Sequence, residues 1–304
     1  MIREVARRAV SLPRCIRHFS SSPDVQPPSP TALSQYVKRI LDRTDQLRRY
    51  QENDVFPPSN WQLRNCYLYA LLQQPTKTEI DAVEFLEGAK FASECVIRAM
   101  HSQDLIDFAG EKAPRPPLAD EMEQMFESMC YQVQFLPRVK RLGLGVSSLE
   151  LRELDFTGVH LSGVSFKRPT RATLKTEEKL LAVGKQAMAQ QKQKMKEMGG
   201  RPNFAELMSG FRSVKEQLES VEMEPHDGSE TLERLQLSTL IHTKQTVEAV
   251  SAKTAERIAV KTEVKTLMCF ESLVTDPQDV DWQITRMKQY GRVVSRELVD
   301  LNAG

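Results

Sequence analysis

Residues 257–287 constrain the fold more than any other stretch, because their side chains alternate in character. The even-numbered positions are apolar or β-branched, and half of the positions between them are charged; the even-numbered set is Ile258, Val260, Thr262, Val264, Thr266, Met268 and Phe270. A two-residue period indicates a β-strand with one face on a core and the other in water, as in antiparallel sheets. Pro277 cannot donate to a ladder, so residues 275–279 form a turn before a second strand at 281–287. The stretch predicts a β-hairpin that closes a curved sheet, with Trp282 in the core.

Three more segments are predicted to be strands. Residues 232–250 alternate cleanly, with Leu235, Leu237 and Ile241 on the apolar side. Residues 146–156 and 159–166 are also strand-like, and Gly158 divides them. The strands therefore lie in the second half of the chain.

Helical patterns come first along the chain. Residues 33–50 predict a short helix, and Thr78 is the expected N-cap of a longer helix over 79–100. The longer helix has a buried stripe of Phe85, Ala89, Ala92, Val96 and Met100. A following helix has the stripe Leu118, Met122, Met125, Phe126, Met129 and Val133. Helices followed by strands predict an α+β domain over residues 61–292, since neither half alone holds an adequate core.

The aromatic segment at residues 61–72 has two interpretations. It contains Trp61, Tyr67 and Tyr69 together with leucines and a single charge, Arg64. Such a segment either covers the domain core or lies on a membrane surface, where Trp and Tyr are enriched.

Residues 167–231 interrupt the strands and predict a helical hairpin. The first arm spaces Leu174, Leu181, Met188 and Met195 seven residues apart, and a Gly-Gly-Arg-Pro sequence at 199–202 separates it from a second arm. Between Lys167 and Lys196 there are nine basic residues and two acidic ones. The candidate contact residues for lipid or RNA are Arg168, Arg171, Lys175, Lys179, Lys185, Lys192, Lys194 and Lys196.

The excess of positive charge on this arm leaves two interpretations open. It favours binding of anionic lipid headgroups or rRNA phosphates. Alternatively the arm is a solvated helix face balanced by the second arm, whose acidic residues are Glu206, Glu216, Glu219, Glu222 and Glu224.

The N-terminus has the composition of a mitochondrial targeting segment. Residues 1–22 contain five arginines and one acidic residue, Glu4, and end in serines. This pattern is typical of a presequence and predicts a matrix location, with the mature chain starting near residue 23. A disordered basic tail is the alternative. Residues 23–60 then form a proline-rich linker and a short helix.

The sequence offers no catalytic, cofactor or metal motif. The five histidines are isolated, no HExxH occurs, and Gly143-Leu144-Gly145 lacks the third glycine of a dinucleotide fingerprint. Asp155 and His160 are the only acid–base pair to consider, and they lack an evident partner. The net charge of +1 does not mark a DNA-binding protein, and no apolar run is long enough to span a membrane. We therefore expect a protein that is not an enzyme.

Three stretches of the chain resemble a known family. They are residues 84–92 (EFLEGAKFA), 267–270 (LMCF) and 281–286 (DWQITR). They resemble the matrix AAA peptidase interacting protein family, within the superfamily of the C-terminal domain of the forty-four-kDa inner-membrane import-motor tether. A mitoribosomal large-subunit protein that anchors ribosomes to the inner membrane shares this domain. The similarity covers residues 61–287 without the 167–231 insertion, and its motifs assign no functional residue.

The resemblance implies a cone-shaped fold like that of nuclear transport factor two, in a matrix protein peripheral on the inner membrane. The leading hypothesis is a non-enzymatic adaptor or chaperone that assists the matrix AAA protease and the biogenesis of imported inner-membrane proteins. The second is a component or membrane anchor of the mitoribosome. An enzyme that uses the cavity of the cone ranks last, because fold analogy does not assign function.

Overall fold

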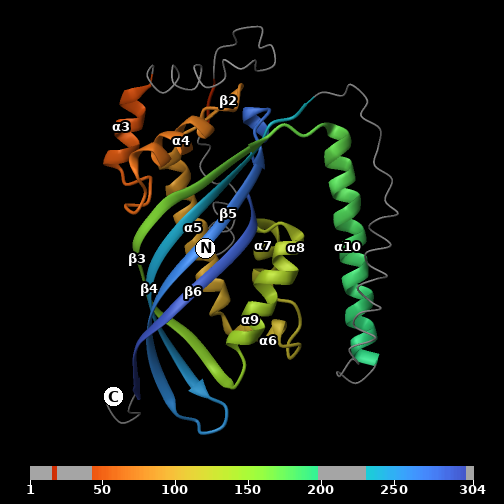
Figure 1. The fold of residues 1–304 in the computed structure, drawn as a ribbon. Coiled ribbons are helices and arrows are strands. Elements are labelled where there is room, and N and C mark those ends of the chain that lie inside the picture. The colour runs from red at the N-terminus through yellow and green to blue at the C-terminus, as the bar shows by residue number, and fades with distance from the viewer. Residues whose placement is uncertain (1–15, 19–42, 198–230, 299–304) are drawn as a thin grey trace. The chain divides into compact units, whose positions relative to one another are not determined.

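Four long strands form one antiparallel sheet and, with several helices, confirm the predicted α+β class (Figure 1). The computed structural model describes residues 16–18, 43–197 and 231–298. In order across the sheet, the strands are β3 (Val146–Lys167), β4 (Arg234–Ser251), β5 (Arg257–Leu273) and β6 (Gln283–Leu298). The chain divides into two units, residues 1–166 with 234–304 and residues 167–233.

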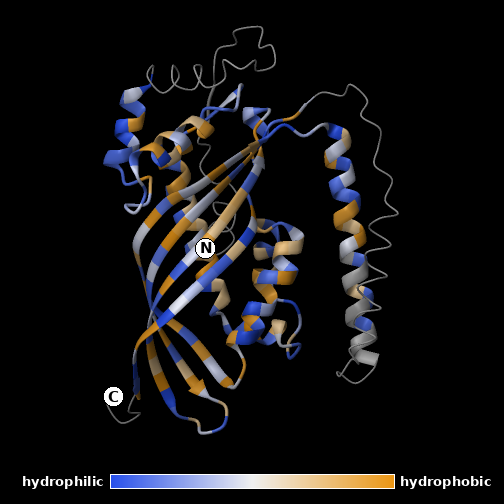
Figure 2. Cartoon of the chain, viewed as in Figure 1, coloured by the Kyte–Doolittle hydropathy of each residue, from blue (hydrophilic) through white to orange (hydrophobic). Residues whose placement is uncertain are grey.

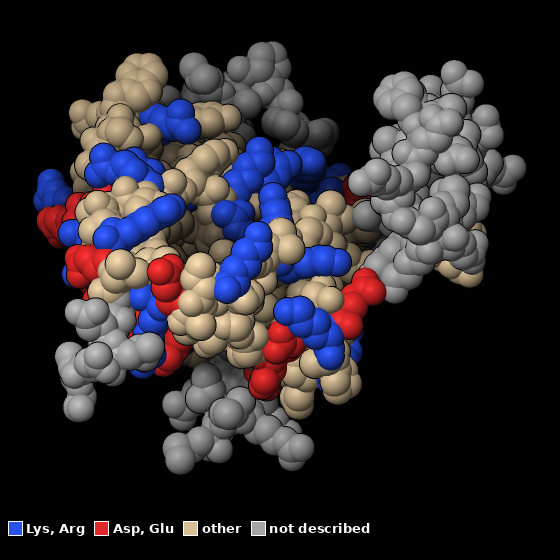
Figure 3. Space-filling model, turned by 90° about the horizontal axis from the view of Figure 1, so that it is seen from below, with Lys and Arg blue, Asp and Glu red and all other residues tan. Residues whose placement is uncertain are grey.

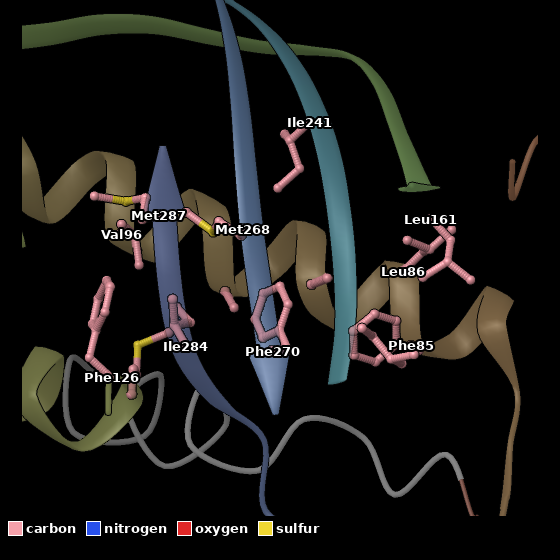
Figure 4. Packing of buried hydrophobic residues seen from close by; sticks show 14 of the residues in the cluster. Phe85, Leu86, Val96, Phe126, Leu161, Ile241, Met268, Phe270, Ile284 and Met287 are labelled. Carbon is pink, nitrogen blue, oxygen red and sulfur yellow. The ribbon is translucent and has the colours of Figure 1, made fainter. Parts of the chain in front are cut away.

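The helices of the first unit precede the sheet in the sequence. They are α3 (Thr44–Glu52), α4 (Gln62–Leu72), α5 (Ala82–Met100), α6 (Gln103–Ala109), α7 (Pro117–Met125), α8 (Ser128–Cys130), a π-helical segment (Tyr131–Phe135) and α9 (Leu136–Leu142). α5 crosses one face of the sheet, and the core lies between them (Figures 1 and 4).

The predicted faces of β4 and β5 are confirmed. Thr266, Met268 and Phe270 are buried on β5, and Leu237 pairs with Phe270 across the ladder. Figure 2 shows hydrophobic and hydrophilic residues alternating along both strands. The rings of Phe85 on α5 and Phe270 lie 5.6 Å apart at 89°, an edge-to-face contact. The stripe predicted on α5 faces this core, since all five of its residues are buried.

The start of α5 differs from the prediction. Thr78 is not its N-cap, because it begins the short strand β2 (Thr78–Ile80) and its Oγ1 donates to the carbonyl of Val274 at 2.6 Å. Asp81 caps the helix instead, since its Oδ1 accepts from the Val83 N–H at 2.9 Å. Asp81 also pairs with Arg49 at 2.8 Å. The two caps differ by three residues, which is the length of β2.

The predicted helix over residues 118–133 is broken into pieces. α7 ends at Met125, and the backbone of Phe126 is extended because it bridges to Ile284 on β6. Met122, Met125 and Phe126 are buried as predicted. Val133 is exposed, because the break and the π-helical segment rotate it out of the stripe.

β3 is one continuous strand, so the predicted division at Gly158 is wrong. Phe156 and Leu161 both pack against the core although they are five residues apart, so the inward face changes parity between them. A Cβ on Gly158 would lie 2.8 Å from Nε2 of His160. Gly158 therefore accommodates the His160 ring instead of ending the strand.

β6 is longer than predicted and begins after Trp282. Ile284 and Met287 are its buried residues, and the register shifts between Cys269 and Phe270 of the neighbouring strand. Trp282 is only half-buried, with its ring 5.0 Å from that of Phe85. The expectation that Trp282 is a core residue of the strand is therefore wrong, because the ladder starts one residue later.

Both edge strands are contacted by segments from earlier in the chain. On β3, the Leu161 N–H donates to the Val55 carbonyl at 2.6 Å and His160 Nδ1 donates to the Asp54 carbonyl at 2.7 Å. On β6, the Ile284 carbonyl accepts from the Glu127 N–H at 2.9 Å. The Met287 N–H donates to the side chain of Gln134 at 2.9 Å.

Most of the predicted presequence and hairpin lies outside the described residues. Of residues 1–22, only Ile16–His18 are described, and they form β1, which pairs antiparallel with β2. Of the helix predicted over 33–50, the described part is α3, which extends to Glu52.

In the second unit, α10 (Arg171–Glu197) is the first arm of the predicted hairpin. At its base, Thr170 bridges to Thr231 and the Leu232 N–H donates to the Pro169 carbonyl at 2.8 Å. The predicted second arm falls within residues 198–230, outside the described chain.

Candidate binding surfaces

The sheet face opposite α5 presents its side chains in rows across β4, β5 and β6. The ladder places His242, Lys265 and Tyr290 in one row. The next two rows are Leu240, Leu267 and Lys288, then Ser238, Cys269 and Arg286. We call these nine residues the basic band, because they include three cations and no acid. The neighbouring strand β3 bonds to two residues of the band. The Thr157 hydroxyl donates to the His242 carbonyl, and the Ser162 hydroxyl donates to the Ser238 carbonyl.

The rows on either side of the basic band each contain a glutamate, Glu263 in one and Glu271 in the other. On one side Arg292 pairs with Glu263 at 2.9 Å. On the other side Arg234 pairs with Glu271 at 3.5 Å. By contrast, Lys265, Arg286 and Lys288 form no ion pair or side-chain hydrogen bond with any of the described residues. The band therefore holds three cations that no acid among the described residues pairs with.

His242 of the band makes an edge-to-face contact with His160 of β3. The ring centroids of His160 and His242 are 6.2 Å apart, at an angle of 89°. Nε2 of His242 is shielded from solvent and has no hydrogen-bond partner among the described residues. Burial lowers the pKa of His242, and the positive charges of Lys265 and His160 lower it further. Burial, the largest cause, and two neighbouring basic side chains therefore both disfavour the protonated imidazole.

A second surface lies on α4. Trp61, at the N-cap, is 67% exposed, and Leu63 and Tyr67 are 66% and 62% exposed. Leu68, Tyr69 and Leu72 of the same segment are buried. Both interpretations of this segment thus have a physical basis, because one side covers the core and the other leaves large apolar side chains in solvent. α4 carries one charge, Arg64, and no acid.

A charged cavity of about 440 Å³ lies beside α3 and β2. Its lining residues are Arg43, Asp45, Gln46, Arg49, Glu79 and Asp81. Arg43 pairs with Glu79 at 3.1 Å, and Arg49 pairs with Asp81 at 2.8 Å. The lining contains no serine, cysteine or histidine.

The residues predicted to contact lipid or RNA are in the second unit. Arg168 precedes α10 and pairs with Glu233 at 3.4 Å. Arg171, Lys175 and Lys179 are exposed on the first turns of α10. Lys185, Lys192, Lys194 and Lys196 lie farther along the same helix. The helix therefore brings seven of the eight predicted residues onto one element.

Sequence reasoning missed the basic band. Lys265, Arg286 and Lys288 are separated in the chain, and only the ladder register places them together. The alternation in residues 257–270 did identify the outward face of β5. The missing signal was the length of β6, because Lys288 and Tyr290 lie beyond the strand that was predicted.

Figure 3 shows the molecule from below, with Lys and Arg side chains gathered across the middle and Asp and Glu mostly toward the margins. At this end of the first unit, the last turn of α9 carries Lys140 and Arg141. Their positive charges suit the negative end of the helix dipole, so they have a structural explanation.

The described residues contain neither a metal site nor a spanning helix. No group of three or more His, Cys, Asp or Glu residues there could hold a metal ion. None of the described helices is long and apolar enough to cross a membrane. Among the described residues no hydrogen bond or ion pair joins Asp155 to His160, whose Nδ1 donates to the Asp54 carbonyl.

Comparison with known proteins gave no match: no protein-family model fits the chain, and no curated protein or solved structure is similar to it.

Proposed function

We propose that this chain is a non-enzymatic adaptor or chaperone of the mitochondrial matrix that works peripherally on the inner membrane. The observation that carries the proposal is the exposed part of α4, with Trp61, Leu63 and Tyr67 in solvent. Amphipathic aromatic rings favour the membrane–water interface, and a surface with one cation and no acid is attracted to an anionic leaflet. The resemblance to the import-motor-tether superfamily, with its cone-shaped fold, supports the same location.

Liposome flotation of the full chain tests membrane binding. Trp61→Ser, Leu63→Ser and Tyr67→Ser together should abolish flotation with cardiolipin-containing vesicles. The matched control is Leu144→Ser, Val294→Ser and Leu298→Ser, which replaces exposed apolar residues elsewhere on the first unit. Equal flotation of both variants would contradict a role for α4, as would a wild-type protein that ignores cardiolipin vesicles at low salt.

The basic arm is expected to add an electrostatic contribution. Each basic residue near an anionic leaflet contributes about 1 kcal/mol, so three or four of them would supply about 3–4 kcal/mol. Replacing Lys185, Lys192, Lys194 and Lys196 by Glu should weaken vesicle binding at low salt and have no effect at high salt, where charges are screened. Unchanged flotation would show that α10 does not contact lipid.

Partners are proposed to be subunits of the matrix AAA protease, and affinity purification from mitochondria tests this. Protease subunits should be retained in EDTA, which dissociates ribosomes. A component or membrane anchor of the mitoribosome is the second candidate function, because α10 presents exposed Arg171, Lys175 and Lys179. Recovery of large-subunit ribosomal proteins without protease subunits would favour this second function.

Matrix location is tested with a reporter. Residues 1–30 fused to a fluorescent protein should direct it into mitochondria and be processed near residues 19–22. A cytosolic reporter of full length would contradict the proposed location.

A further inference from the structure

The basic band has more charge than the sheet itself needs. Edge strands often carry lysines that prevent pairing with other chains, which would explain Arg286 and Lys288 on β6. It does not explain Lys265, because β5 is a central strand between β4 and β6. Nor does it explain Tyr290, an aromatic residue that is 65% exposed in the same row as Lys265.

The side chains of the band differ in their exposure to solvent. Lys265, Arg286, Lys288 and Tyr290 are exposed, whereas Leu240 and Leu267 are half-buried and Cys269 is buried. The band has one exposed aromatic ring and no exposed aliphatic side chain, unlike α4 with its exposed Trp61, Leu63 and Tyr67. Exposed cations beside an exposed aromatic ring instead fit a ligand with both phosphates and stacking bases.

We propose that the basic band binds a single-stranded nucleic acid, with its phosphates on Lys265, Arg286 and Lys288 and one base stacked on Tyr290. Open antiparallel sheets bind RNA in this way elsewhere, because unpaired bases can lie flat on exposed rings. A flexible single strand can also follow the twist of a sheet, which a rigid duplex cannot match as closely. β3 adds no negative charge here, since residues 156–166 contain no acid.

Binding of a fluorescein-labelled twenty-nucleotide oligo(U) to the full chain tests the charges. The variant Lys265→Gln, Arg286→Gln, Lys288→Gln should lose most of the affinity at low salt. Each phosphate contact contributes about 0.7 to the slope of log K against log salt for single strands, so the slope should fall by about 2. The charge-matched control is Lys244→Gln, Lys261→Gln, Arg296→Gln, all exposed β-strand cations outside the band. The control should keep its affinity and slope.

Tyr290 provides a test that is independent of charge. Tyr290→Ala should weaken oligo(U) binding roughly 5- to 150-fold, and Tyr290→Phe should restore it, because stacking requires the ring and not the hydroxyl. The salt slope should not change in either variant. An unchanged affinity of Tyr290→Ala would overturn the stacking contact.

A spectroscopic measurement locates the ligand. Bound phosphates beside Lys265 would favour protonated His242, so NMR titration should show a rise in the His242 pKa when oligo(U) is added. His101 is held on α5–α6 by a bond from its Nδ1 to the Ile97 carbonyl and should not respond.

A lack of oligo(U) binding, or equal loss in the control variant, would overturn the proposal. The triple Gln variant should still float with vesicles, and loss of flotation without loss of oligo(U) binding would assign the band to lipid.

Discussion

Phe270 and Trp282 both contact the ring of Phe85, yet they differ in burial. Phe270 is buried within the core, and Trp282 is half-exposed. Loss of a buried Phe side chain leaves a cavity and costs about 3–5 kcal/mol of unfolding free energy. Phe270→Ala should therefore lower the urea midpoint more than Trp282→Ala does. The opposite order would show that the Trp282 ring is the more important of the two contacts.

His101 is predicted to make stability depend on pH. Burial lowers its pKa below the ordinary value of 6.5, although the bond to the Ile97 carbonyl raises it in part. A lowered pKa means that the folded state binds a proton less readily than the unfolded state does. The free energy of unfolding should therefore have its full value above pH 6.5. It should fall at lower pH, by up to about 1.4 kcal/mol per pH unit.

Urea unfolding of wild type and His101→Gln between pH 5 and 8 measures this contribution. The variant should show a shallower fall below pH 6.5. Some dependence should remain, because the His242 pKa is lowered as well. Identical pH profiles would mean that protonation of His101 does not destabilise the folded state.

At the level of single residues, the sequence predicted burial where local periodicity determined it. Met268 and Leu237 follow from alternation alone. Thr78 was placed incorrectly because hydroxyl side chains cap helices and also bond strand backbones, and local sequence does not distinguish these uses. Its partner, the Val274 carbonyl, lies 196 residues away.

Within β3, the two glycines are expected to respond differently to alanine. A Cβ at Gly163 would lie 3.4 Å from the Ser238 Cβ, an ordinary contact, whereas one at Gly158 would meet the His160 ring at 2.8 Å. Gly163→Ala should be neutral or stabilising by up to about 1 kcal/mol, since it reduces the entropy of the unfolded chain. Gly158→Ala should destabilise, because His160 must move away from its bond to Asp54.

A double-mutant cycle with His160→Ala tests this explanation. In that background Gly158→Ala should lose its penalty, with an interaction energy above about 0.5 kcal/mol. Additive effects would place the strain of Gly158→Ala in the backbone of β3 and not at the His160 ring.

Whole elements were predicted best where one face is buried and the other solvated. β4 and β5 meet this condition along most of their length. The far half of β6 does not, since Tyr290, Val293, Val294 and Leu298 are all exposed and show no inward face. The sequence did not distinguish the two sides of α4 either, because the aromatic residues that cover the core and those in solvent share one short segment.

For the molecule as a whole, the 167–233 unit is predicted to be dispensable for folding. β3 and β4 are neighbours in the sheet, and the Pro169–Leu232 bond holds the two ends of the unit together. Replacing residues 170–231 by Gly-Asn-Gly-Ser should leave the unfolding free energy within about 2 kcal/mol of the full chain, because loop length affects closure entropy only weakly. Urea unfolding checks this, and a chain that fails to fold would show that the unit is part of the core.

A repeat of apolar residues every seven positions predicted a helix in this unit, and the structure has α10 at Arg171–Glu197. The class of the sheet domain also followed from the order of helices and strands. The basic band did not follow, because surfaces assembled from three strands depend on register, and register is fixed by long-range contacts.

The contacts on the two edge strands bear on how the chain is made. An unpaired edge can recruit another chain while the protein is still folding. The segments that contact β3 and β6 are residues 54–55 and 126–134, and both emerge from a ribosome, or from an N-terminal-first translocation pore, before the strands that they contact. Each edge strand can thus contact its covering segment as soon as the strand emerges. A circular permutant that starts at residue 146 would reverse this order, and it should aggregate more during synthesis.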